Sequence, residues 1–193
     1  REDGSVCQSA SFDSQTGKLI KTYTHKVFSP NSTWGRAQAW AMMSYAYLSA
    51  LYPENREIRD YAERVCRWWI ETVPDDGVAY WDFDAPQETG TPKDTSATSI
   101  ACYALLTLAT VLDDQEVAQE YQGKARATVK TLCRDYVATI PGGAGTIPPL
   151  VLTRGCFDPM RGVAIEHELI WGDYFLLHCL GLLTGRLPTK RLG

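Results

Sequence analysis

The stretch that decides the fold runs over residues 34–48 and reads Trp34-Gly-Arg-Ala-Gln-Ala-Trp-Ala-Met-Met-Ser-Tyr-Ala-Tyr-Leu. It carries one formal charge. A cap at Ser32 or Thr33 and a stop at Pro53 predict a helix over about 33–52. A helix that is apolar on nearly every side is buried. We therefore expect this helix to lie inside the protein.

Four further helices follow, and charged and uncharged helices alternate along the chain. They are predicted over about 54–73 (with Glu54 and Glu57 in its first turn), from Asp94, Thr95 or Ser96 to about 112, over about 115–137, and over about 164–184. The first and third helices are nearly free of charge, whereas the second and fourth carry acids and bases throughout and should face water.

This alternation predicts a repeated helical hairpin in which inner helices are ringed by outer ones, an α/α toroid. Long loops return from each outer helix to the next inner one, first over 74–92 and then around 141–149. These loops should meet at one end and form a pocket. Five helices indicate an incomplete ring. Before the first helix, two short strands or extended segments (6–13 and 22–26) flank a turn at Gly17.

Size and composition describe an ordinary globular domain over residues 1–193. A chain of 193 residues with 45% hydrophobic and 22% charged residues can bury a sizeable core. A net charge of -4 without a basic run argues against a nucleic-acid partner. We find no apolar run suited to a bilayer and no signal peptide, so no membrane partner is expected.

The six cysteines lack the spacing of a metal site, and no cofactor or metal is expected. Four lie in predicted helices and are interpreted as buried, reduced thiols: Cys66, Cys102, Cys133 and Cys179. Such thiols favour a cytoplasmic location, although the sequence leaves the compartment open. Cys7 and Cys156 lie in loops and could pair, but nothing in the sequence requires it.

Arg36, the one charge of the first helix, needs an anionic partner. Burying an unpaired charge is costly, and a guanidinium suits a carboxylate held through two parallel hydrogen bonds. One interpretation is a clamp for an acidic sugar, with Trp40 beside it at the i+4 position. The other is an internal salt bridge with Trp40 in the core. The sequence leaves both open. Gln8, His25 and Lys26 could face the same pocket mouth.

In order along the chain, the sequence resembles the unsaturated glucuronyl hydrolases, glycoside hydrolase family 88, fungal branch. The matching motifs are Gly4-Ser-Val, Phe12-Asp13 with Thr16-Gly17, Thr24-His25, Ser32-Thr-Trp-Gly-Arg-Ala-Gln-Ala-Trp40, Tyr80-Trp-Asp-Phe-Asp84, Asp94-Thr-Ser-Ala97 and Leu169-Ile-Trp-Gly-Asp-Tyr-Phe175. The resemblance implies an (α/α)6 toroid of which this chain covers the C-terminal half or slightly more.

It also implies an unusual hydrolysis. A carboxyl group protonates the C4=C5 vinyl ether of a 4,5-unsaturated uronic acid at the non-reducing end of a lyase product. Water adds at C5, and the hemiketal then opens and releases the remaining sugar. The implied partner is thus an unsaturated uronate oligosaccharide.

The resemblance implies substrate contacts for residues of this chain. Arg36, Trp40 and Tyr174 match residues that line the family's pocket around the unsaturated uronate. His25 and Lys26 match a loop where many relatives have His-Gln. Lys26 is a departure that could alter the preference for sulfated or acetylated sugars, and Gln8 lies where bacterial relatives have His.

The family's two essential aspartates belong to the N-terminal half, so no catalytic residue is expected here. Four aspartates of this chain do not replace them convincingly: Asp82, Asp84, Asp94 (an expected N-cap) and Asp173. Two alternatives are a non-catalytic carbohydrate-binding or interaction half-toroid, and an unsaturated rhamnogalacturonyl hydrolase. The open edges of half a ring further predict self-association.

Overall fold

The computed structural model describes residues 1–23, 26–138 and 151–188. Within them lie a two-stranded hairpin, five α-helices and one short 3-10 helix. Their bounds are β1 Ser9–Phe12, β2 Leu19–Tyr23, α1 Gly35–Leu51, α2 Arg56–Thr72, α3 Thr95–Leu108, α4 Gln115–Asp135, η1 Pro159–Arg161 and α5 Ile170–Leu183. His25 and the predicted loop around 141–149 lie outside the described residues.

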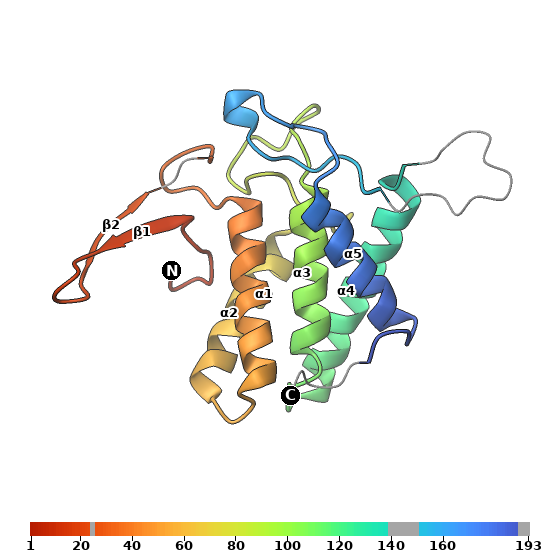
Figure 1. Ribbon diagram of the computed structural model, residues 1–193, viewed down its shortest axis with the longest axis horizontal. Coiled ribbons are helices and arrows are strands. Elements are labelled where there is room, and N and C mark those ends of the chain that lie inside the picture. The colour runs from red at the N-terminus through yellow and green to blue at the C-terminus, as the bar shows by residue number, and fades with distance from the viewer. Residues whose placement is uncertain (24–25, 139–150, 189–193) are drawn as a thin grey trace, which may run out of the picture.

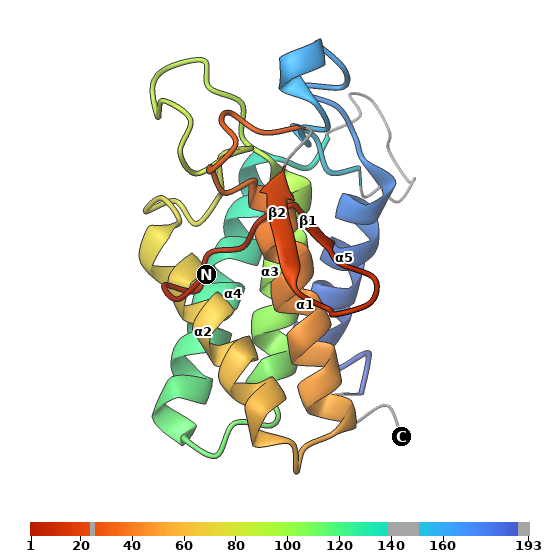
Figure 2. The same ribbon diagram turned by 90° about the vertical axis from the view of Figure 1, so that its left-hand side faces the viewer.

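The helices form two layers, as the alternation of charge predicts. Helices α1, α3 and α5 lie side by side, and α2 and α4 lie behind them (Figures 1 and 2). Helix α3 is central and contacts all four other helices. Twelve of its residues are buried, whereas α2 and α4 bury one stripe each. The inner position of α1 and α3 is confirmed.

Small residues let the inner helices approach closely. A Cβ added at Gly172 of α5 would lie 3.1 Å from Cβ of Ser96 on α3. Across the same contact, the Ser99 hydroxyl donates to the Gly172 carbonyl at 3.0 Å. The small side chains at the start of α3 thus allow α5 to reach it.

The predicted cap of the first helix is wrong. Trp34 occupies the N-cap position and makes no side-chain cap. The Ser32 hydroxyl instead donates to Asp82 Oδ2 at 2.7 Å, and the Gly35 N–H donates to the Trp81 carbonyl at 2.9 Å. The loop at 80–84 therefore satisfies the start of this helix. The next helix also starts later than predicted, because Asn55 caps it and leaves Glu54 outside.

Helix α5 begins about six residues later than predicted. Ala164, the expected start, has φ +48, which is outside the right-handed helical region. Residues 155–167 form paired loop segments instead, with isolated bridges between Gly155 and His167 and between Asp158 and Val163. Backbone pairing thus replaces a helical turn before Ile170.

The N-terminal hairpin is confirmed. Strands β1 and β2 are antiparallel, and the turn places Gly17 at φ +70. Among the cysteines, Cys66, Cys102 and Cys179 are buried as expected, but Cys133 is exposed because it lies on the water-facing side of α4. Cys7 and Cys156 are both free thiols. None of the described helices has the length and hydrophobicity needed to cross a bilayer.

Candidate functional site

The inner helices α1, α3 and α5 all begin at the same end of the bundle, where the loops gather (Figure 1). Backbone pairing fastens these loops to the helix starts. Trp34 and Asp82 form an isolated bridge, and the Asp94 N–H donates to the Ala79 carbonyl at 2.9 Å. Three helix N-termini therefore surround one polar cluster.

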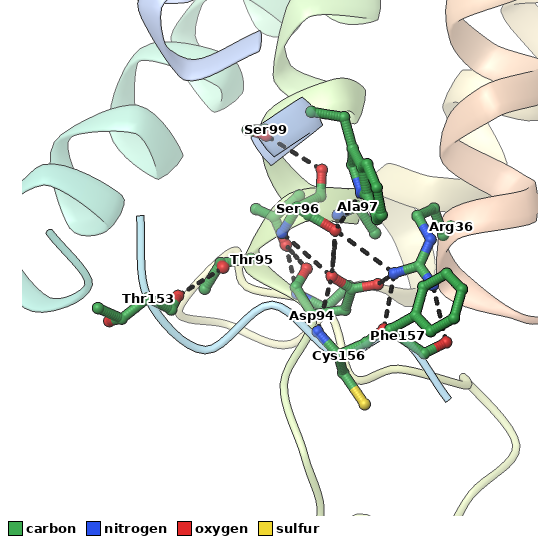
Figure 3. A network of polar contacts seen from close by, with 12 residues as sticks. Arg36, Asp94, Thr95, Ser96, Ala97, Ser99, Thr153, Cys156 and Phe157 are labelled. Carbon is green, nitrogen blue, oxygen red and sulfur yellow. Dashed lines mark hydrogen bonds and ion pairs between the residues drawn. The ribbon is translucent and has the colours of Figure 1, made fainter. Parts of the chain in front are cut away.

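The centre of this cluster is a buried ion pair between α1 and the start of α3 (Figure 3). Arg36 Nη1 lies 2.5 Å from Asp94 Oδ2, and the two side chains are 2% and 0% exposed. Arg36 also donates to the Cys156 carbonyl at 2.6 Å and to the Phe157 carbonyl at 2.9 Å. The pair thus ties the 151–169 segment to both helices.

This arrangement corrects the argument made for Arg36. The premise of an unpaired charge awaiting a ligand is wrong, because Asp94 neutralises Arg36 within the same chain. The internal salt bridge, the other alternative, is what the structure contains. A contact between Arg36 and a substrate stays a proposal.

Asp94 serves two functions at once. Its Oδ1 accepts from the N–H groups of Ser96 at 3.1 Å and Ala97 at 3.2 Å, which confirms the expected N-cap of α3. Its Oδ2 pairs with Arg36. A negative charge at a helix N-terminus is favourable. The carboxylate is therefore stabilised by the helix start as well as by the guanidinium.

The network extends to α5 through Ser96. The Ser96 hydroxyl donates to Asp94 Oδ1 at 2.6 Å and accepts from Trp171 Nε1 at 3.0 Å. The guanidinium carbon of Arg36 lies 5.5 Å from the centre of the Trp171 ring. All three inner helices thus contribute to one hydrogen-bonded cluster.

Aromatic rings surround the guanidinium of Arg36, but the Trp40 ring, which the i+4 spacing predicts beside it, is not among the rings recorded there. The Arg36 carbon lies 4.5 Å from the Trp34 ring centre and 5.6 Å from that of Phe157. Trp40 packs edge-on against Phe175 at 5.6 Å and is half-buried. Its ring therefore belongs to the contact between α1 and α5.

Tyr174 lies on α5, one turn into the helix, with 53% of its surface exposed. Its ring contacts Phe175 at 5.0 Å and His178 at 4.5 Å between centres. The side chain is thus accessible to a ligand, although it belongs to a different cluster from Arg36.

Of the three predicted loop residues, the structure connects Lys26 to the cluster. Lys26 Nζ lies 3.4 Å from the centre of the Phe157 ring. The backbone carbonyl of Phe157 in turn accepts a hydrogen bond from Arg36. Burial lowers the pKa of Lys26, the Asp158 charge opposes this shift, and the Arg36 charge adds to it. Gln8 lies directly before β1 and is half-buried.

The aspartates considered as substitute acids all accept hydrogen bonds. Asp82 Oδ2 accepts from the Phe28 N–H at 3.1 Å and its Oδ1 from the Asp84 N–H at 3.0 Å. Asp84 accepts from the Thr33 N–H at 2.8 Å, and Asp173 from the Leu152 N–H at 2.6 Å. Asp94 accepts from backbone N–H groups as well and forms the ion pair, so all four aspartates hold loops or helix starts in place through hydrogen bonds.

Sequence reasoning missed several members of the cluster. Trp34 and Ser96 lie within the family motifs Ser32–Trp40 and Asp94–Ala97, so their positions beside Arg36 and Asp94 could have indicated that they belong to the cluster. The carbonyls of Cys156 and Phe157 carry no side-chain signal at all. Burial raises the pKa of the Cys156 thiol to about 12, so this thiol stays neutral at pH 7. In the described ranges, no group of three His, Cys, Asp or Glu side chains could hold a metal ion.

A comparison with protein families decides where the chain belongs. The profile of Glycosyl Hydrolase Family 88 matches residues 4–152. The chain belongs to this family. It is similar to the unsaturated glucuronyl hydrolase of Bacillus sp. (strain GL1), with 34% identity over 181 residues that cover 93% of this chain and 47% of that protein. The chain thus spans about half the length of this curated relative.

Solved structures agree with the family. A UGL variant with dGlcA-Glc-Rha-Glc superposes with a TM-score of 0.88 and 34% identity, over 100% of this chain and 51% of that one. An unsaturated glucuronyl hydrolase variant from Streptococcus agalactiae, complexed with dGlcA-GalNAc6S, gives 0.77 and 27%, over 97% and 49%. These neighbours are (α/α)6 toroids, so the two helical layers belong to that fold and the predicted fold class is confirmed.

Proposed function

We propose that this chain forms the C-terminal part of an (α/α)6 catalytic domain that binds oligosaccharides ending in a 4,5-unsaturated uronic acid. The observation that carries the proposal is the similarity along 93% of the chain to an unsaturated glucuronyl hydrolase. The matched segment includes the loop end where Arg36 and Asp94 pair. Aromatic rings at that end supply apolar surface for a sugar.

In this proposal the chain supplies one wall of the pocket and the catalytic carboxylates lie outside it. Tyr174 is the exposed binding residue, Lys26, Gln8 and Trp40 are half-buried candidates, and His25 is a further candidate. Arg36, whose charge is paired with Asp94, contributes by holding the 156–157 carbonyls in place. Lys26 would favour sugars that carry an anionic substituent.

Binding and turnover are measured separately to test this. Titration of an unsaturated glucuronyl disaccharide, followed by tryptophan fluorescence, should show binding. Turnover is followed by the absorbance of the double bond, which should stay constant with this chain alone. A full-length unsaturated glucuronyl hydrolase, as the positive control, should make this absorbance fall. Turnover by this chain would contradict the placement of the acid elsewhere.

A pair of tyrosines makes the binding test specific. Tyr174→Ala should weaken binding about tenfold, as for loss of a stacking contact. Tyr52→Ala is the control, because Tyr52 is similarly exposed (50%) but lies at the opposite end of α1. Equal binding by both variants would remove Tyr174 from the site. Tighter binding of a sugar that ends in unsaturated galacturonyl-rhamnose would favour the rhamnogalacturonyl alternative. Binding without turnover, even when the N-terminal half of the domain is supplied, would favour a binding module.

We also propose that the chain self-associates through α5. Ile170 and Leu177 lie two turns apart on α5 and are 69% and 59% exposed. Exposed apolar side chains on one helix face are typical of an interface. Light scattering should detect dimers or larger species, and Leu177→Ser should shift them toward the monomer. A monodisperse monomer at high concentration would contradict this proposal.

A further inference from the structure

Asp158 is a buried charge that the fold itself does not explain. The residue is 2% exposed, and its Oδ1 has no hydrogen-bond partner among the described residues. Its Oδ2 lies 3.8 Å from Nε of Arg161, a side chain that is 69% exposed. The other buried carboxylates at this end, Asp82 and Asp94, each accept several hydrogen bonds. Burying a carboxylate without such partners is costly, so its retention points to a function.

The residue next to it is the aromatic centre of the cluster. Phe157 lies between Lys26, whose ammonium sits over its ring, and Arg36, which donates to its carbonyl. Lys26 is held there by a cation–π contact, which a flexible side chain can leave at small cost. Asp158 is the carboxylate whose charge acts on Lys26. Movement of the Lys26 side chain would therefore uncover the Phe157 ring, which directly precedes Asp158 in the chain.

A second buried polar atom, close to Arg36, also lacks a hydrogen-bond partner in the described part of the chain. Trp34 Nε1 is buried and unpaired among the described residues, and its ring lies 4.5 Å from the Arg36 guanidinium carbon. The unmet donor thus lies on a ring beside Arg36, and the unmet acceptor belongs to the residue after Phe157, whose carbonyl accepts from Arg36. Groups that remain unpaired in a folded protein are commonly met by ordered water or by a ligand.

The charges of this shell select the class of ligand. Lys26 and Arg161 are the cations recorded beside Asp158, whereas Arg36 is paired with Asp94. These two cations disfavour a cationic ligand, whereas an anionic group placed at Asp158 would meet its carboxylate directly. A neutral hydroxyl avoids both penalties. It donates to a carboxylate and accepts from an indole N–H.

We propose that Asp158 is a sugar-binding residue, which accepts a hydrogen bond from a ring hydroxyl of the bound oligosaccharide once Lys26 leaves the Phe157 ring. Trp34 Nε1 donates to the same sugar. The apolar face of that sugar packs on Phe157. This inference rests on the proposed function insofar as the sugar belongs to an unsaturated uronate oligosaccharide.

The test compares Asp158→Asn with the unchanged chain, by thermal melting and by binding of two probes. The probes are an unsaturated glucuronyl disaccharide and a saturated, uncharged disaccharide. Without sugar, Asp158→Asn should melt at about the same temperature as the unchanged chain, because Oδ1 makes no hydrogen bond to the described residues that the substitution could break. Its binding of the unsaturated disaccharide should be about tenfold weaker or more, as for a lost hydrogen bond to a charged group. Asp113→Asn is the control, because Asp113 is 88% exposed and distant from this end.

The outcomes separate the two proposals. If Asp158→Asn melts lower, fails to fold or binds the sugar unchanged, Asp158 is structural and the inference is overturned while the proposed function stands. If only the uncharged sugar binds, and Asp158→Asn weakens it, the inference stands and the preference for unsaturated uronate falls. No binding of either probe to the unchanged chain overturns both. Trp34→Phe is the second variant, and binding equal to that of the unchanged chain would remove the indole donor from the site.

Discussion

Replacement of Asp94 by Asn should remove most of what the buried ion pair contributes to the free energy of unfolding. The substitution removes the charge opposite Arg36 but leaves an amide oxygen to cap α3, because Asn and Asp cap helices equally well. Arg36 is 2% exposed and cannot regain solvent without movement of the 156–157 segment. Loss of one partner of a buried pair costs about 3–5 kcal/mol. We expect Asp94→Asn to lower the free energy of unfolding by about that amount.

Asp94→Ala removes the cap as well as the charge. The lost hydrogen bonds to Ser96 and Ala97 should add about 1 kcal/mol. Native domains have a total stability of about 5–15 kcal/mol, so this variant should be close to unfolding. The difference between the Asn and Ala variants measures the cap, and the loss common to both measures the charge.

Asp114→Ala provides a matched control. Asp114 caps α4 with the same geometry, accepting from Glu116 N–H at 2.9 Å and Val117 N–H at 3.2 Å, but it is exposed. Its loss should cost about 1 kcal/mol. The assay is urea unfolding at equilibrium, followed by tryptophan fluorescence and circular dichroism. If Asp94→Asn is no more destabilising than Asp114→Ala, Arg36 does not depend on Asp94 and the reasoning fails.

Two further predictions concern a backbone position and a titration. Gly4→Ala should destabilise the chain far more than Gly17→Ala in the same unfolding assay: both have positive φ (+94 and +70), but only at Gly4 would the new Cβ meet a backbone carbonyl, that of Arg64, at 2.5 Å. Equal losses would mean that the N-terminal segment can move away. Burial, with Glu168 beside it, raises the pKa of Asp173 above its ordinary value of 3.8. Its charge therefore opposes folding as pH rises through the raised pKa, and Asp173→Asn should raise the melting temperature at pH 7 but not at pH 3.5. A gain equal at both pH values would contradict the titration.

The layer arrangement followed from charge patterning alone. Arg36 is the single charge of α1, whereas α2 and α4 carry charges along one side, and this contrast predicts which helices face water. The hairpin turn at Gly17 and the cap at Asp94 were likewise predictable, since both depend on residues adjacent in the sequence. Local physics was sufficient wherever the deciding contact was local.

Tertiary structure decided the partners of the buried polar groups. Arg36 meets Asp94 across 58 positions and Phe157 across 121, and no pattern of spacing along one helix reports such contacts. The start of α5 and the cap of α1 were mispredicted for the same reason, because paired loop segments satisfy those backbone groups from a distance. Periodicity determined which surfaces are apolar, since that depends on each residue's own chemistry. Which charge neutralises which depends on chain segments brought together by folding, and only the folded arrangement contains that information.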